Sequence, residues 1–256
     1  MRTLRLLGVG CLVHGKMRFA SPTVAALEMI WPLFFATIAF FLFRAGGGAE
    51  ALVYASLGAA VMGVWSATST ASGNALQRER WHGTLELLAA APVHFALILL
   101  PMTITLAALG IYGMVATLLW GRFLFGVDLP LEHPLAFAVA LPLTIVSVGT
   151  AGFLLAVAFV RHRAGWALGN MLEYPVWLIA GFLVPLTLLP DWVRPISWAL
   201  APTWGMSAIR EAASGGTPWP DIVVCAGIGA VYTAIGIVLV ERMLRAAREK
   251  AALALA

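Results

Sequence analysis

Long apolar stretches, each closed by a short polar or glycine-rich segment, run along almost the whole chain. A helix needs about 20 mostly apolar residues to cross a bilayer, and six stretches approach or exceed that length. They lie at about residues 23–43, 51–75, 95–120, 134–160, 164–189 and 222–240. The pattern therefore predicts an all-α polytopic membrane protein, with a single transmembrane domain of six helices over 1–256.

An apolar stretch near the N-terminus is too short to span and is followed at once by basic residues. Leu4, Leu7, Cys11 and Leu12 recur there at helical spacing. This spacing predicts that 1–20 forms an amphipathic interfacial helix on the cytoplasmic membrane surface. The stretch lacks a small-residue cleavage pattern, which argues against a signal peptide.

A second short apolar run, 195–209, lies between the fifth and sixth predicted spans. It is too short to cross a bilayer. Pro202 and Gly205 are expected to break it, so that 190–220 is predicted to form an extracellular re-entrant segment before the last helix.

Lysine and arginine residues near the predicted helix ends set the orientation. Six spans place both termini on one side, and that side carries 12 of the 16 basic residues. Because basic residues concentrate in cytoplasmic loops, this division predicts a multi-pass protein with both termini in the cytoplasm. The remaining four basic residues, on the opposite side, are Arg44, Arg122, Arg194 and Arg210.

Composition excludes several classes of function. Charged residues make up 11% of the chain, less than half of the roughly 25% typical of soluble domains, so most of the surface is predicted to face lipid. The basic residues are too scattered for a nucleic-acid partner. Neither Cys11 nor Cys225 lies near a second cysteine or a histidine at metal-binding spacing, so no metal site and no cofactor are expected in this chain.

The cytoplasmic loop between the second and third predicted spans has the features of a short helix. Gly83 permits a sharp turn, Thr84 can accept a hydrogen bond from a free backbone N–H, and Glu86 complements the positive end of a helix. Leu88 lies on an apolar stripe, and Pro92 stops the run. Such a helix fits either a groove on a partner protein or a position on the lipid surface, and the pattern alone does not choose.

The residues of this loop resemble a known family. The run RERWHGTLELLAAAP, residues 78–92, resembles the cytoplasmic signature of ABC-2-type transporter permeases, which is close to E-R-x-x-G-T-L-E-x-L-x-x-x-P. The run 181–192 resembles the end of the family's fifth helix and the start of its extracellular re-entrant segment. The chain departs at Trp81 and His82, where the family more often has polar or charged residues. The predicted count of six spans also agrees with the family, so the resemblance extends over nearly the whole chain.

The resemblance implies a subunit of a bacterial ABC exporter in the inner membrane. Each permease would be half of a transmembrane dimer, as a homodimer or with a paralogue, above two copies of an ATP-binding subunit that binds ATP and Mg²⁺. This chain has no P-loop around either lysine, so a separate polypeptide is expected to hydrolyse ATP. The resemblance makes 76–94 a coupling loop, with the ATPase contacts assigned to Gly83, Thr84, Leu85, Glu86, Leu87, Leu88 and Pro92.

Polar residues inside the predicted spans are candidates for a translocation path. Glu173 lies about ten residues into the fifth span, beside Asn170 and Tyr174, and the second span carries Ser66 and Thr70. A carboxylate at that depth costs about 2.5–3.5 kcal/mol to insert, so Glu173 should face protein or water. Both a path lining and a structural role near the inner interface remain open.

The function predicted first is a non-catalytic permease that exports a small amphiphilic molecule, such as a drug, an antibiotic or a lipid-like compound. Short loops without a carbohydrate-binding extension favour this over export of a polysaccharide or a glycolipid. A proton-coupled secondary transporter that uses Glu173 is a further alternative, but the six spans show no inverted repeat. A membrane enzyme lacks support, since no paired-carboxylate, His-metal or Ser-His constellation is present, and no catalytic residue is expected.

Overall fold

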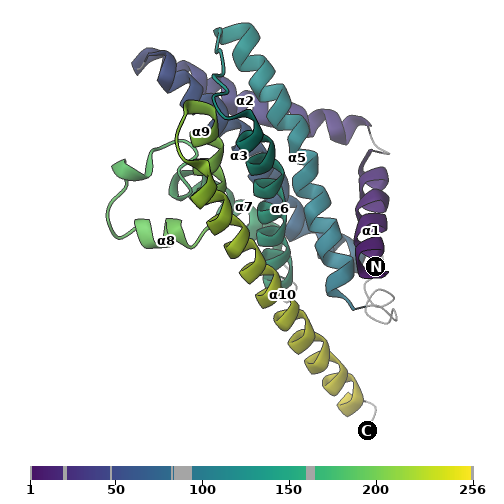
Figure 1. The fold of residues 1–256 in the computed structure, drawn as a ribbon. Helices are drawn as coiled ribbons and strands as arrows, with labels where there is room; N and C mark the ends of the chain where they lie inside the picture. The colour runs from purple at the N-terminus through teal and green to yellow at the C-terminus, as the bar shows by residue number, and fades with distance from the viewer. Residues whose placement is uncertain are drawn as a thin grey trace.

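The computed structural model describes residues 2–19, 22–46, 48–81, 83, 94–159 and 165–254. These residues form helices and turns and contain no β-strand, as the apolar pattern predicts (Figure 1). The helices are α1 (Arg2–Phe19), α2 (Pro22–Gly46), α3 (Ala49–Trp81), α5 (Ala96–Phe125), α6 (Pro134–Phe159), α7 (Gly165–Ile179), a 3₁₀ turn (Leu186–Leu188), α8 (Arg194–Trp198), α9 (Ala201–Ser214) and α10 (Pro218–Ala254).

Four helices in the described part of the chain are long and apolar enough to cross a membrane. Their apolar stretches are Glu50–Thr70 in α3, Ala96–Phe125, Pro134–Phe159, and Pro218–Met243 in α10. They coincide with the second, third, fourth and sixth predicted spans. The first predicted span corresponds to α2, whose described apolar part is the shorter Pro32–Ala45. The fifth corresponds to α7, which has 15 residues.

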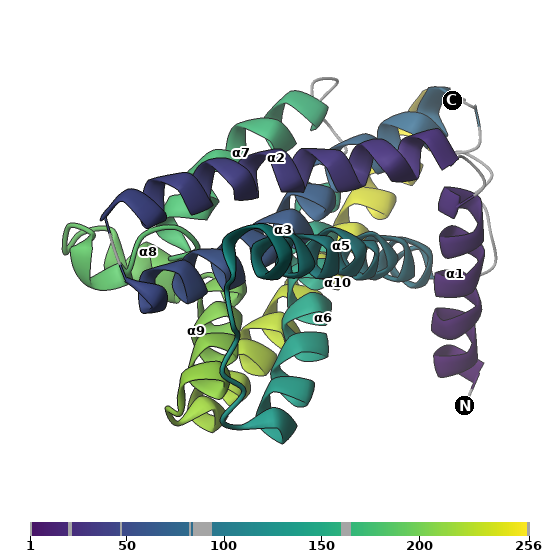
Figure 2. The same cartoon turned by 90° about the horizontal axis from the view of Figure 1, so that it is seen from above.

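Helix α3 lies at the centre of the molecule. Seen from above, α2 and α7 lie on one side of it, and α6 and α9 on the other (Figure 2). Within its apolar stretch, 67% of α3 is buried, whereas α10 buries 22% and presents Val223 and Val231 outward. The central helix therefore packs against protein, and the outer face of α10 is suited to lipid.

Glycines allow α2 to lie directly against two helices. Pro32 of α2 faces Gly63 of α3 and Gly113 of α5, where an added Cβ would come within 3.3 and 3.2 Å of the proline ring. Eight residues later, Phe40 is fully buried against Gly121 of α5. Small residues at these positions permit close helix contact, as is common between membrane helices.

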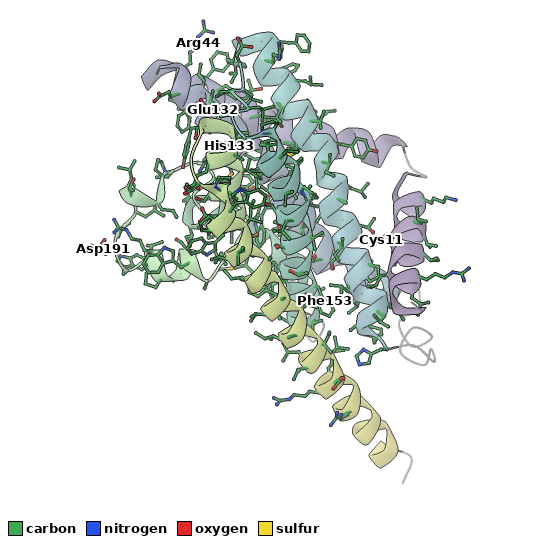
Figure 3. All side chains as sticks on the ribbon, in the orientation of Figure 1. Cys11, Arg44, Glu132, His133, Phe153 and Asp191 are labelled. Atoms are coloured by element: carbon green, nitrogen blue, oxygen red, sulfur yellow. The ribbon has the colours of Figure 1, made fainter. Side chains whose placement is uncertain are left out.

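Helix α1 packs along the start of α5. The Cys11 thiol donates to the Pro101 carbonyl at 3.6 Å, and the Thr105 hydroxyl contacts the Cys11 carbonyl at 3.4 Å (Figure 3). The other side of α1 exposes Val9 and Val13. This apolar face suits contact with lipid, and the placement of the helix on the membrane surface stays a prediction.

The turns between helices separate toward two ends of the molecule. Arg44, Glu132 and His133 lie at one end, and α10 projects from the other, where α5 begins (Figure 3). The start of α1 lies toward that second end as well (Figure 1). The end of α2, which carries Arg44, and the turn that carries Glu132 therefore lie on a common side, and the six-span count and the orientation of the termini stay predictions.

Two helices have bounds that differ from the predicted spans. Helix α3 continues to Trp81, past the predicted span end at 75, because helix-forming polar residues extend the helix beyond its apolar part. Helix α7 ends at Ile179, ten residues before the predicted end at 189. Gly181 has φ of 75°, a left-handed conformation that ends helices.

The predicted break at Gly205 is wrong. Helix α9 runs from Ala201 to Ser214 through this glycine, and Pro202 occupies its first turn, where proline is well tolerated. Gly205 serves a packing role: an added Cβ would come within 2.6 Å of the Thr144 hydroxyl oxygen on α6. The real interruption lies between α8 and α9, at 199–200.

Candidate functional site

The predicted coupling residues lie mostly outside the described part of the chain. Gly83 is exposed and has φ of 68°, the left-handed conformation of a sharp turn after α3. The other six, Thr84, Leu85, Glu86, Leu87, Leu88 and Pro92, fall outside the described residues. Their contact with an ATPase stays a prediction.

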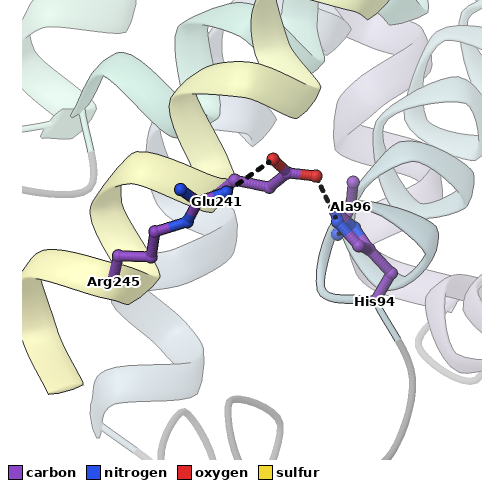
Figure 4. Close-up of polar contacts among 4 residues, drawn as sticks. All are labelled: His94, Ala96, Glu241 and Arg245. Carbon is purple, nitrogen blue, oxygen red and sulfur yellow. Dashed lines mark hydrogen bonds and ion pairs between the residues drawn. The ribbon is translucent and has the colours of Figure 1, made fainter.

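The C-terminal end of the predicted coupling loop is attached to α10. His94 lies two residues before Ala96, the first residue of α5, and its Nε2 lies 3.1 Å from Glu241 Oε1 on α10 (Figure 4). The other ring nitrogen, Nδ1, accepts from the Ala96 backbone N–H at 3.4 Å. The second oxygen of Glu241 lies 3.5 Å from Arg245 Nη2, one turn along α10. A loop residue is thus joined to a helix 147 positions later in the chain.

A small apolar cluster lies beside this polar contact. Phe95 and Leu99 of α5, Phe153 and Val157 of α6, and Val240 of α10 are all buried in it. Phe153 is labelled between α6 and α10 in Figure 3. The start of α5, the end of α6 and the middle of α10 therefore pack as one unit at the end of the molecule where α10 projects.

A second polar region lies where α7 crosses α3. The Thr70 hydroxyl donates to the Asn170 side-chain oxygen at 3.3 Å, and Gly169 allows this approach, since an added Cβ would lie 2.7 Å from the Ser69 carbonyl oxygen. Glu173, one turn further along α7, is only 7% exposed. Within the described residues it has no hydrogen bond or ion pair. Isolated burial of a carboxylate is costly, which makes Glu173 a candidate for function.

The other two predicted path residues, Ser66 and Tyr174, lie at different positions around the α3–α7 contact. Ser66 is half-buried on α3, one turn before Thr70. Tyr174 is 50% exposed, and its ring lies 6.5 Å from the ring of Phe35 on α2, so it belongs to the side of α7 that faces α2. Two buried indole nitrogens, those of Trp65 and Trp177, have no hydrogen-bond partner among the described residues. The α3–α7 contact thus holds several polar atoms in apolar surroundings.

Arg210 of α9 holds the end of the interrupted helix α7. Its guanidinium donates to the Gly181 carbonyl at 2.6 Å and to the Phe182 carbonyl at 2.7 Å. It also lies over the Tyr54 ring, 3.3 Å from the centroid, while the Tyr54 hydroxyl donates to the Gly181 carbonyl at 3.0 Å. A cation at a helix C-terminus neutralises the negative end of the helix dipole. These four residues, Tyr54, Gly181, Phe182 and Arg210, are called the α7 clasp below.

Sequence reasoning did not find the His94–Glu241 contact or the α7 clasp. Both pair residues that are far apart in the chain, and no local motif marks them. One signal was present for the clasp: Arg210 follows an apolar run, and a charge in such a place is expected to have a partner.

The comparison with known families identifies the class of protein. The family described as ABC-2 type transporter matches residues 16–213, more than half of the chain. The chain belongs to this family, which confirms the resemblance of its loop motif, and it is a membrane permease component of an ABC transporter. Such permeases work with an ATP-binding subunit and do not themselves catalyse hydrolysis. No curated protein matches the chain.

Proposed function

We propose that this permease is the membrane half of an ATP-driven bacterial exporter that moves a small amphiphilic molecule out of the cytoplasm. The family match carries the proposal. The substrate class is supported by the α3–α7 contact, where a buried carboxylate and indole N–H groups without a partner among the described residues lie among apolar and aromatic side chains. The turns described at 126–133 and 215–217 are short, which leaves no room there for a carbohydrate-binding domain.

In this proposal α2 and α7 complete a set of six spans in the inner membrane, with both termini in the cytoplasm. A second permease copy, identical or paralogous, covers the side of the molecule formed by these two helices. That side exposes Phe41 and Leu42 of α2 and Met171 and Leu178 of α7. Two copies of an ATP-binding subunit, which hold ATP and Mg²⁺, lie beneath the coupling loops.

Purification of the full-length protein from membranes tests the subunit assignment. The wild type is expected to bring down an ATP-hydrolysing subunit in a complex with two permeases and two ATPases by native mass spectrometry. Glu86→Arg and Leu88→Asp are expected to lower its association or its ATPase rate by about tenfold or more, since each disrupts the proposed docking helix.

Matched controls come from the opposite end of the molecule. Asp128→Arg and Leu188→Asp make the same kinds of change at positions that are largely exposed. Both should behave like the wild type. If no ATP-binding protein associates with the wild type, or if the loop variants match these controls, the proposed role of the loop is wrong.

Glu173 is expected to show opposite effects on stability and on transport. Glu173→Leu removes a buried carboxylate that lacks a described partner, so the thermal midpoint should stay unchanged or rise. Export of an amphiphilic dye such as ethidium should fall about tenfold or more if the carboxylate lines the path. Glu173→Gln, which keeps the shape and loses the charge, separates a requirement for charge from one for hydrogen bonding.

The control for Glu173 is Glu50→Leu in the first turn of α3, where the carboxylate is exposed. It should leave both measurements unchanged. A fall in the thermal midpoint of Glu173→Leu, with dye export retained, would show that Glu173 is structural. Dye export that persists without ATP and follows a proton gradient would instead support a secondary transporter.

A further inference from the structure

The last residue of the predicted coupling loop makes a polar contact with the last helix. Helix α6 packs on both α5 and α10, whereas α5 and α10 contact each other little. Beside the start of α5, His94 reaches Glu241 on α10 at 3.1 Å (Figure 4). Any displacement of the loop end is therefore applied directly to α10.

Hydrogen bonding on both sides fixes the orientation of the His94 ring. Nδ1 accepts from the Ala96 N–H, so in the neutral ring the proton is on Nε2. Nε2–H then donates to Glu241 Oε1. The His94 carbonyl also accepts from the Leu97 N–H at 2.8 Å, which ties the residue to the first turn of α5. His94 thus links the start of one helix to the side of another.

The burial of this contact does not suit a role in stability. The side chains of His94 and Glu241 are each 41% exposed, and exposed ion pairs contribute little to the free energy of folding. The neighbouring apolar cluster supplies the stable packing, because Phe95 and Val240 are almost fully buried. The polar pair instead determines which residue of α10 is joined to the end of the loop.

The packing of α10 on α6 continues this connection. Gly236 faces the ring of Phe153, where an added Cβ would overlap the ring, and Phe153 is fully buried. Beyond this point α10 extends from Glu241 to Ala254, past the apolar stretch that ends at Met243. A helix is rigid over such a length, so movement at Glu241 carries this extension with it.

We propose that His94 and Glu241 are positioning residues for energy coupling: they transmit movement of the coupling loop to α10 and its projecting end. The inference rests on the proposed function, since the movement comes from closure of the ATPase subunits. The family match ends at residue 213, so it does not assign this role to α10. Arg245 holds the second Glu241 oxygen from the same helix and is not part of the link.

Hydrogen–deuterium exchange on the full permease–ATPase complex tests this link without a known substrate. Trapping the ATPase closed with ATP and vanadate is expected to change the exchange rate of peptides covering 237–254 by about twofold or more. His94→Ala and Glu241→Ala should each abolish this change, and the double variant should be no worse than either single one. Glu241→Gln retains an acceptor for Nε2–H and should retain the response.

The control is Arg245→Gln, which leaves the His94–Glu241 contact in place and should respond like the wild type. Vanadate-dependent protection of the loop peptides 82–93 should persist in every variant, which shows that each one folds and binds the ATPase. If peptides 237–254 respond equally in His94→Ala and wild type, or do not respond in wild type, the link is wrong. If no ATPase binds the wild type at all, the proposed function fails, and the link fails with it.

Discussion

Arg210→Leu is expected to lower the free energy of unfolding by about 3 kcal/mol, because hydrogen bonds to a charged group are each worth about 1.5–3 kcal/mol. The substitution removes the donor at 2.7 Å from the Phe182 carbonyl and the donor at 2.6 Å from the Gly181 carbonyl, which keeps its second donor, the Tyr54 hydroxyl at 3.0 Å. It also removes the cation from the face of the Tyr54 ring. For a chain of this size the thermal midpoint should fall by roughly 6–12 °C, measured as the surviving size-exclusion peak after heating in detergent.

Arg194→Leu is the matched control for this prediction. Arg194 lies in the same segment between α7 and α10, but its ion pair with Asp191 is largely exposed, with side-chain exposures of 41% and 90%. Exposed pairs contribute about 0–1 kcal/mol, so this variant should stay close to the wild type. Arg210→Lys keeps the charge but lacks the fork of donors and should fall between the two. Equal midpoints for Arg210→Leu and Arg194→Leu would contradict the clasp.

Hydropathy predicted the spans because burial in lipid and burial in protein both select apolar residues. Four predicted spans coincide with long apolar helices of the described chain. Hydropathy reports where a helix enters a membrane and not where the helix ends. The helix ends at Trp81 and Ala254 therefore lie beyond the predicted spans, since polar residues that favour helix continue both α3 and α10 past their apolar parts.

The apolar run that follows Gly181 hid the end of α7. Residues 182–189 are as apolar as a span, but in the structure the helix ends at Ile179, just before the left-handed Gly181. Glycine adopts that conformation readily but does not require it, so the residue type alone does not decide. The structure shows what stabilises the break: Arg210, 29 residues later, binds the free carbonyls.

The candidate sites could also be predicted only in part, because consecutive residues form a recognisable motif and contacts between distant residues do not. The loop motif was readable because its residues are consecutive, and the family match supports it. The Thr70–Asn170 and His94–Glu241 contacts join residues 100 and 147 positions apart. Such pairs depend on the register between packed helices, which one sequence does not specify. Glycines such as Gly169 set that register by allowing backbones to approach, and a glycine in an apolar run gives no sign of which helix will approach it.

Gly58→Ala is expected to destabilise the protein by about 3 kcal/mol, at the upper end of the usual cost of overpacking. A methyl group at this position of α3 would overlap the Phe182 carbonyl oxygen and lie 2.9 Å from the Phe182 carbonyl carbon. The obstacle is backbone, so no side-chain rotation relieves it. The end of α7 would have to move away from α3, and Arg210 Nη2, 3.0 Å from the same methyl, would lose its place in the α7 clasp.

Two other glycines calibrate the effect of Gly58→Ala on the thermal midpoint. Gly227 of α10 has nothing within 4 Å of an added Cβ, so Gly227→Ala should be neutral or gain up to about 1 kcal/mol from helix propensity. Gly63 faces the Pro32 ring at 3.3 Å and should give an intermediate loss.

Because Gly58 and Arg210 act on one carbonyl, the double variant Gly58→Ala/Arg210→Leu should lose less than the two separate losses combined. If the two losses in the thermal midpoint were strictly additive, the two residues would stabilise different features. If Gly58→Ala had the same midpoint as Gly227→Ala, α3 and the end of α7 would not approach this closely.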